Sequence, residues 1–240
     1  ASVFLVFVVS AQQNKRRNLL TGKYSEEFVG QSLVKGTSWV HFPVYSDRQG
    51  WESVPDQIRK KYISEGEKYL TYEWKSVPAT TYLEFNRSGN RQVNEKYLSG
   101  IIDPLRNLFI AELFEGKGRF TDQLINGVWA MCEMTSWSSA AHIKAQETGE
   151  GLPNYAEPII DLHSARNAHL LAWIRYYFKD EFEKVNPFIV QRIDYEINRR
   201  VLEPFYTRDD FRWMALKGQI VGNWNPYCNS HVLAVIMLSE

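Results

Sequence analysis

The sequence has few cysteines, no excess of either charge and no hydrophobic run long enough to span a membrane. Its 240 residues contain two cysteines, Cys132 and Cys228, which excludes a disulfide framework and a CxxC metal site. Each is predicted to be a buried apolar group, although one disulfide stays open for an exported protein. With 28 basic and 28 acidic side chains, the chain lacks the basic face of a nucleic-acid binder.

The chain also lacks the signatures of several common enzyme folds. No alternating strand pairs with hairpin turns follow residue 20, and neither a G-x-G-x-x-G fingerprint nor a P-loop occurs. A G-x-S-x-G elbow is absent too, so a serine nucleophile is not supported. Aromatic residues are plentiful: 13 Phe, 13 Tyr and 8 Trp, or 14%. Tyr and Trp rings suit flat hydroxylated ligands, although a large core also uses aromatics.

The first residues are typical of the end of a secretory signal peptide. An unbroken apolar run covers residues 3–9, and small residues follow it in the spacing that a signal peptidase favours. We therefore expect residues 1–11 to be a signal-peptide remnant and Gln12 to be the first mature residue. A buried strand is the alternative, because the run has high β propensity. The chain closes on an apolar helical run without a cap, so residues 12–240 are expected to be a partial domain.

From Glu26 onward the hydrophobic spacing is helical. Repeated helix pairs joined by long loops predict an all-α array of helical hairpins, either an open solenoid or a closed ring. Pro204 is expected to end or kink the helix in which it lies. The predicted helices are 24–33, one from Pro55, 103–114 with Asp103-Pro104 as cap and first turn, one from Thr121 or Asp122, 161–182, one after Pro187 and one after Asn225-Pro226.

The loop region 126–142 is the first candidate for a binding site. Trp129 and Glu133 are four residues apart and share a helical face, and Trp137 and His142 follow them. An acid beside indole rings suits a carbohydrate site, because the rings stack on sugar faces and the carboxylate accepts from hydroxyls. The alternative is that the Trp residues belong to the core and that Glu133 is a solvated or helix-capping acid.

The region 208–232 is the second candidate. Asn225 precedes Pro226 and therefore has an alternative role as a helix N-cap. Asn223 has no such structural role, and a neutral amide in a cleft can hydrogen-bond a substrate carboxylate. Trp224 lies between them.

The third region, 160–173, repeats His163, Arg166 and His169 at helical spacing. The two histidines are six residues apart and have only Asp161 nearby, so a metal site lacks a third ligand. His169 is predicted to be a satisfied core histidine, and Arg166 a structural partner of an acid.

Six segments of the chain carry a resemblance to a known family: AELFEGKGRF, NGVWAMCEMTSW, LPNYAEPIIDLHSAR, LLAW, QRIDYEINRRVLEPFYTRDDFRWM and GNWNPYCNSHVLAVIMLSE. They resemble the heparinase II/III-like family of polysaccharide lyases. The resemblance covers about residues 37–240 and implies an (α/α) toroid, an incomplete ring of helical hairpins that a β-sandwich follows in the family. This chain is expected to hold part of the toroid and none of the sandwich.

The resemblance implies β-elimination at a uronic acid. That reaction neutralises the uronate carboxylate, removes the C5 proton and protonates the leaving oxygen. In the family an Asn, or an Asn-His pair, meets the carboxylate, and a Tyr and a His transfer the protons. Asn223 matches the Asn, and Trp224 stands where relatives can have His. The Tyr and the second His are expected beyond Glu240, so Tyr227 and His231 are not assigned to these roles and this chain alone is expected to be inactive.

The resulting hypothesis is a periplasmic or secreted lyase that acts on an acidic polysaccharide and needs no cofactor or metal. Asn223 is the predicted catalytic residue. One alternative is a glycoside hydrolase on a similar ring, which needs a second carboxylate beside Glu133, such as Asp209 or Asp210. Another is a glycan-binding array without catalysis. The predicted substrate-binding residues are Trp129, Glu133, Trp137, His142, Trp224 and Asn225.

Overall fold

The computed structural model describes residues 22–34 and 36–239, and every regular element in those ranges is helical, which confirms the all-α prediction. Residues 1–11, predicted to be a signal-peptide remnant, lie outside the described residues. The helices are α1 (Glu26–Ser32), α2 (Arg48–Glu52), α3 (Asp56–Glu67), α4 (Ala79–Ser88), α5 (Gln92–Glu115), α6 (Thr121–Cys132), α7 (Leu162–Val185), α8 (Phe188–Ile197), α9 (Glu203–Thr207) and α10 (Trp224–Ser239), with the 3₁₀ turns η1 (Ala140–Ala145) and η3 (Arg212–Met214) and the π-helix η2 (Asn198–Leu202).

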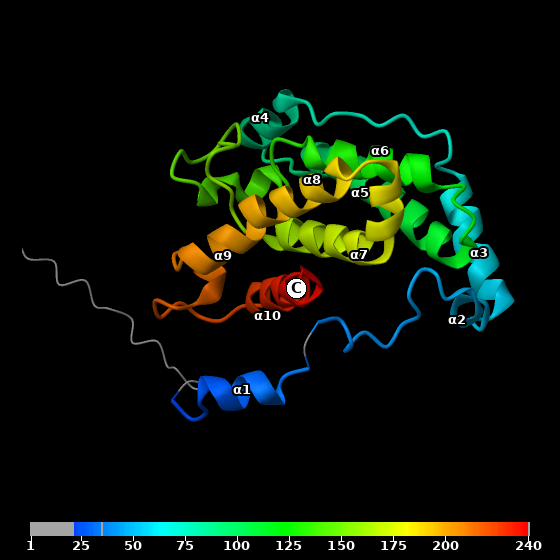
Figure 1. The fold of residues 1–240 in the computed structure, drawn as a ribbon. Helices are drawn as coiled ribbons and strands as arrows, with labels where there is room; N and C mark the ends of the chain where they lie inside the picture. Colours follow the sequence, from blue (N-terminus) through cyan, green and yellow to red (C-terminus); the bar gives the residue numbers. More distant parts are fainter. Residues whose placement is uncertain (1–21, 35, 240) are drawn as a thin grey trace, which may run out of the picture.

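Consecutive long helices pack in pairs (Figure 1). α5 packs against α3 and α6, α7 packs against α8, and α10 returns to lie along α7. In the described residues no helix has the length and apolar character that a membrane span requires. The long helices of the described residues therefore pack against one another, both with neighbours in the chain and with more distant helices.

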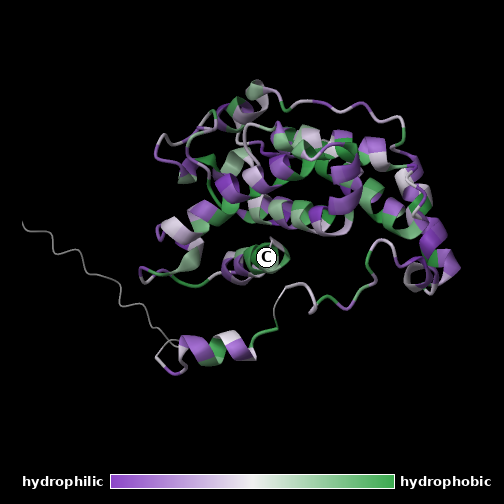
Figure 2. Cartoon of the chain, in the orientation of Figure 1, coloured by the Kyte–Doolittle hydropathy of each residue, from purple (hydrophilic) through white to green (hydrophobic). Residues whose placement is uncertain are grey.

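The hydrophobic stripes of the helices form the core. Leu105, Leu108 and Leu113 on α5 are buried. On α8, Ile189, Ile193 and Ile197 are spaced four residues apart and are buried too. Removing these side chains from water is the main stabilising term of such a fold. Figure 2 shows that α10 is largely hydrophobic along the part that follows its polar first turns.

One predicted helix boundary is wrong. Asp103-Pro104 does not start a helix, because α5 begins at Gln92 and continues through Pro104. Proline has no N–H, so the carbonyl of Gly100, four residues earlier, loses its helical partner. The Tyr72 hydroxyl donates to that carbonyl at 2.7 Å. A side chain from outside the helix thus satisfies the group that Pro104 leaves free, and the helix continues.

Pro204 does not end the helical run, and the helix type changes just before it instead. The chain stays helical, but α8 widens into the π-helix η2 before α9 begins at Glu203. The Glu203 N–H donates to the carbonyl of Asn198, which is the five-residue spacing of a π turn. The wider turn accommodates the proline without ending the helical run.

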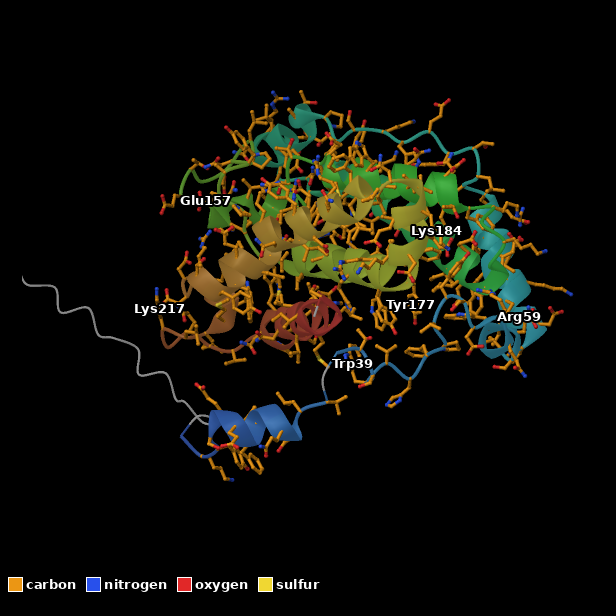
Figure 3. The ribbon with its side chains drawn as sticks, in the orientation of Figure 1. Trp39, Arg59, Glu157, Tyr177, Lys184 and Lys217 are labelled. Atoms are coloured by element: carbon orange, nitrogen blue, oxygen red, sulfur yellow. The ribbon has the colours of Figure 1, made fainter. Side chains whose placement is uncertain are left out.

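Two of the long inter-helix loops, α6–α7 and α9–α10, lie at one end of the molecule. Glu157, in the α6–α7 loop, and Lys217, in the α9–α10 loop, lie at the same end, whereas Lys184 and Arg59 lie at the other (Figure 3). α7 and α10 both start at the loop end and run in the same direction. His142 contacts the rings of His163 and Trp224 in their first turns.

Candidate functional site

A pocket of about 610 Å³ opens at the loop end of the molecule. The segments that form it are η1, the residues just before α7, the loop around η3 and the start of α10. Most of its wall is apolar or aromatic, with a few polar groups among them, which is typical of ligand sites. It is lined by Ala141, His142, Lys144, Ala145, Ile159, Ile160, Asp161, Asp210, Phe211, Arg212, Trp213, Ile220, Gly222 and Trp224.

His142 and Asp161 form a hydrogen-bonded pair in the wall of this pocket. The distance from His142 Nδ1 to Asp161 Oδ2 is 2.6 Å, and Asp161 is buried. Asp161 is also the N-cap of α7: its Oδ1 accepts from the Ser164 N–H at 2.7 Å, while the Ser164 hydroxyl accepts from the Asp161 N–H. This capping box holds the carboxylate still, so the orientation of the imidazole is determined by the start of α7.

The pair determines which nitrogen of His142 carries the hydrogen. A carboxylate only accepts, so Nδ1 donates to it and the lone pair of the neutral ring is on Nε2. Burial alone would raise the pKa of Asp161, but the hydrogen bond from His142 and the neighbouring imidazoles hold that pKa below its usual range. Asp161 therefore stays ionised, and Nε2 of His142, which has no protein partner among the described residues, has the lone pair of a general base.

Trp224 lines the same pocket, and Asn223 stands in the chain between two of its lining residues, Gly222 and Trp224. The rings of Trp224 and His142 meet edge to face, with 4.6 Å between their centroids. Asn223 directly precedes α10 and is exposed, and its side-chain amide makes no hydrogen bond within the described ranges. Its backbone carbonyl accepts from the Tyr227 N–H. The structure thus brings His142 and Trp224 together, and the exposed amide of Asn223, next to Trp224 in the chain, is available to a ligand.

A row of polar side chains continues from the pocket along the contact between α7 and α10. His163 Nδ1 lies 3.5 Å from Arg166 Nη2, and His163 Nε2 lies 3.7 Å from a Glu95 oxygen. Farther along, Nδ1 of His169 and Nδ1 of His231 are 2.6 Å apart. The prediction that His169 is a satisfied core histidine agrees with its two hydrogen bonds, the second from the Trp173 indole at 2.8 Å.

Trp129 and Glu133 lie elsewhere. Glu133 lines a different pocket, of about 830 Å³, and pairs with Arg192 at 3.2 Å. The Arg192 guanidinium also lies over the ring of Trp129, which is 42% exposed. These two residues share a surface, as their spacing predicts, but that surface is not the pocket that holds His142.

Two other predicted substrate contacts are structural in this arrangement. Trp137 is 2% exposed, donates its indole N–H to the Met131 carbonyl and packs under the Arg200 guanidinium. Its ring belongs to the core, so the prediction that it lines a sugar cleft is corrected. The Asn225 amide donates to the backbone carbonyls of Trp213 and Met214 in η3, at 3.0 and 3.3 Å. It fastens the loop around η3 to α10, so its amide nitrogen is not free for a substrate.

The residues that the hydrolase alternative requires are not brought together. Asp210 lines the pocket of His142 and pairs with Arg208, whereas Glu133 lines the other pocket, and Asp209 pairs with Lys217. A glycosidase needs one carboxylate on each side of the bond that it cleaves.

The two cysteines are buried and unpaired. Among the described residues no group of three or more side chains could hold a metal ion.

The partnership between His142 and Asp161 has no signal in the sequence that links the two residues. The only local pattern is Asp161-x-x-Ser164, which is typical of a capping box and says nothing about a histidine 19 positions away.

No family model matches the chain, and comparison with curated proteins finds none with significant similarity. The resemblance to heparinase II/III-like lyases therefore stays a prediction.

Proposed function

We propose that this protein is an exported polysaccharide lyase that cleaves a uronic-acid-containing chain by β-elimination on a toroid of helical hairpins. The observation that carries the proposal is the buried Asp161 bonded to His142 in a pocket that also holds Trp224 and adjoins the free amide of Asn223. A general base, an aromatic platform and an amide donor are three of the groups that such a reaction uses.

The proposed step begins at C5 of the uronate. Nε2 of His142 takes the C5 proton, and the electron pair of that C–H bond forms the double bond between C4 and C5. The bond between C4 and the glycosidic oxygen breaks, its electron pair goes to the oxygen, and the oxygen takes a proton from a protonated side chain or water. Asn223 hydrogen-bonds the carboxylate while negative charge builds up at C5, which stabilises the transition state.

The test is the release of 4,5-unsaturated uronides, followed by their ultraviolet absorbance. We expect activity on at least one polymer in a panel of glycosaminoglycans, alginates and other uronates, with the protein in the longest form that its gene encodes. His142→Ala and Asn223→Ala should each lower the rate about 10²- to 10⁴-fold. His41→Ala, at an exposed histidine outside the pocket, is the matched control and should keep the rate.

Glu133→Gln separates the lyase from the hydrolase. The lyase should lose little activity from this change, because Glu133 lines the other pocket. A large loss with Glu133→Gln, together with new reducing ends that carry no double bond, would favour a hydrolase. Glycan binding without any cleavage would favour the binding array.

A further inference from the structure

Among the buried and partly buried arginines of residues 22–34 and 36–239, Arg166 alone bonds neither an acid nor a backbone carbonyl. Each of the others bonds a carboxylate or backbone carbonyls; Arg200, for example, bonds Glu196 and the carbonyl of Met134. Arg166 is half-buried, forms no ion pair among the described residues, and its Nε is buried without a hydrogen-bond partner. A half-buried cation without an acid is costly unless a ligand or another group compensates it.

A histidine stands between Arg166 and the acid Glu95. His163 lies between them, with Nδ1 toward the guanidinium at 3.5 Å and Nε2 toward Glu95 at 3.7 Å. Glu95 is also engaged by the Ser139 hydroxyl at 3.0 Å and by Arg91. Burial lowers the pKa of His163, which favours its neutral form. The positive charge of Arg166 is thus bordered by a neutral ring.

Where α10 packs against α7, a chain of hydrogen bonds sets the tautomer of His231. The Trp173 indole can only donate, so Nε2 of His169 accepts and its hydrogen is on Nδ1. That N–H donates to Nδ1 of His231 across 2.6 Å. In neutral His231 the hydrogen must then be on Nε2. His231 is therefore a hydrogen-bond donor at its remaining nitrogen.

The two histidines join α7 and α10 at the same level. His169 and His231 are each the eighth residue of their helix. Burial and the charge of Arg166 lower the pKa of His231, so the second ring remains neutral near the guanidinium.

We infer that Arg166 is the centre of an anion-binding site between α7 and α10, which takes a carboxylate or sulfate group of a glycan. The guanidinium supplies the charge and its forked N–H groups, and Nε2 of His231 supplies a neutral donor. The site lies beside the pocket of His142, because His163 contacts both Arg166 and the His142 ring. Only the glycan nature of the ligand rests on the proposed function.

The experiment measures binding of D-glucuronate, inorganic sulfate and D-glucose by calorimetry at low ionic strength, with the protein in the longest form that its gene encodes. Glucuronate, sulfate or both should bind more tightly than glucose, and added salt should weaken the binding. Arg166→Gln should weaken it at least about ten-fold, and Arg166→Lys less, because lysine keeps the charge without the fork. Arg87→Gln, at an exposed arginine on α4, is the matched control and should bind as the wild type does.

An NMR titration of His231 is a second readout that needs no ligand. Arg166→Gln should raise the pKa of His231, because it removes a nearby positive charge. An unchanged His231 titration, or equal glucuronate and sulfate affinity for Arg166→Gln and the wild type, overturns the inference. Anion binding through Arg166 without release of unsaturated uronides retains the site and rejects the lyase. Uronide release with unaltered binding in Arg166→Gln retains the lyase and rejects the site.

Discussion

A buried arginine, Arg200, and a half-buried one, Arg166, have opposite environments. Arg200 bonds the buried Glu196 and the carbonyls of Cys132, Met134 and Thr135, at the end of α6 and the start of the loop that follows. It lies in the wall of the larger pocket. Arg166, between α7 and α10, has neither acid nor carbonyl within the described residues. The first region satisfies its charges internally and is structural. The second leaves a cation and an amide unsatisfied, which is what a binding site requires.

The largest expected effect is on catalysis, from Asp161→Asn. The amide oxygen can still accept from the Ser164 N–H, which places the NH₂ group toward His142 and favours the tautomer with the hydrogen on Nε2. His142 then has no lone pair toward the pocket, so the rate of uronide release should fall about 10²- to 10⁴-fold. Nitrogen NMR shifts of His142 should report the change of tautomer.

Ser164→Ala is the control for this change, because it removes the capping hydroxyl and keeps the carboxylate. It should leave most of the activity. An active Asp161→Asn protein with an unchanged His142 tautomer would show that the acid does not orient the ring.

The next effect is on stability, from Arg200→Met. This change leaves the buried Glu196 with only Arg192 and Arg199 and removes the donors of several carbonyls. We expect the free energy of unfolding in urea to fall by about 3 kcal/mol. Arg166→Met should change it by less than about 1 kcal/mol or raise it, because no partner is left behind. Equal losses in the two variants would contradict the distinction between a satisfied and an unsatisfied arginine.

Tyr72→Phe tests the satisfied side of the comparison at a backbone group. It leaves the Gly100 carbonyl, which Pro104 already deprives of a helical partner, without the tyrosine hydroxyl. The expected loss is about 1–2 kcal/mol in the free energy of unfolding, measured by urea denaturation. Tyr206→Phe, at an exposed hydroxyl on α9, is the control and should cost nothing measurable.

The smallest expected effect is a pH dependence from the histidine pair. Burial, and then the electrostatic influence of the neighbouring His231, lowers the pKa of His169 to about 4. An unfolded histidine takes up its proton near pH 6.5, so between that pH and about 4 the unfolded state binds more protons. The free energy of unfolding should therefore fall as the pH decreases through this window. His169→Gln should reduce the slope, and an unchanged slope would contradict the assignment.

Part of the candidate site was predictable and part was not. Trp224 and His142 are an aromatic and a polar residue in predicted loop regions, and the structure places both at one pocket, with Asn223 next to Trp224 in the chain. Glu133 was assigned to the same cleft because it follows Trp129 by one helical turn, but that turn faces the second pocket. Helical spacing shows that two residues share a face and leaves open which neighbour the face meets.

The sequence by itself determined the helices, most of their ends and the buried stripes, because periodicity, caps and glycine conformations act over a few residues; Gly116, for example, ends α5 in the left-handed region. Only the tertiary structure decided which polar groups meet. The pairs of His142 with Asp161 and of His169 with His231 join residues 19 and 62 positions apart. A hydrogen bond acts over about 3 Å, so such pairs exist only once α10 lies along α7.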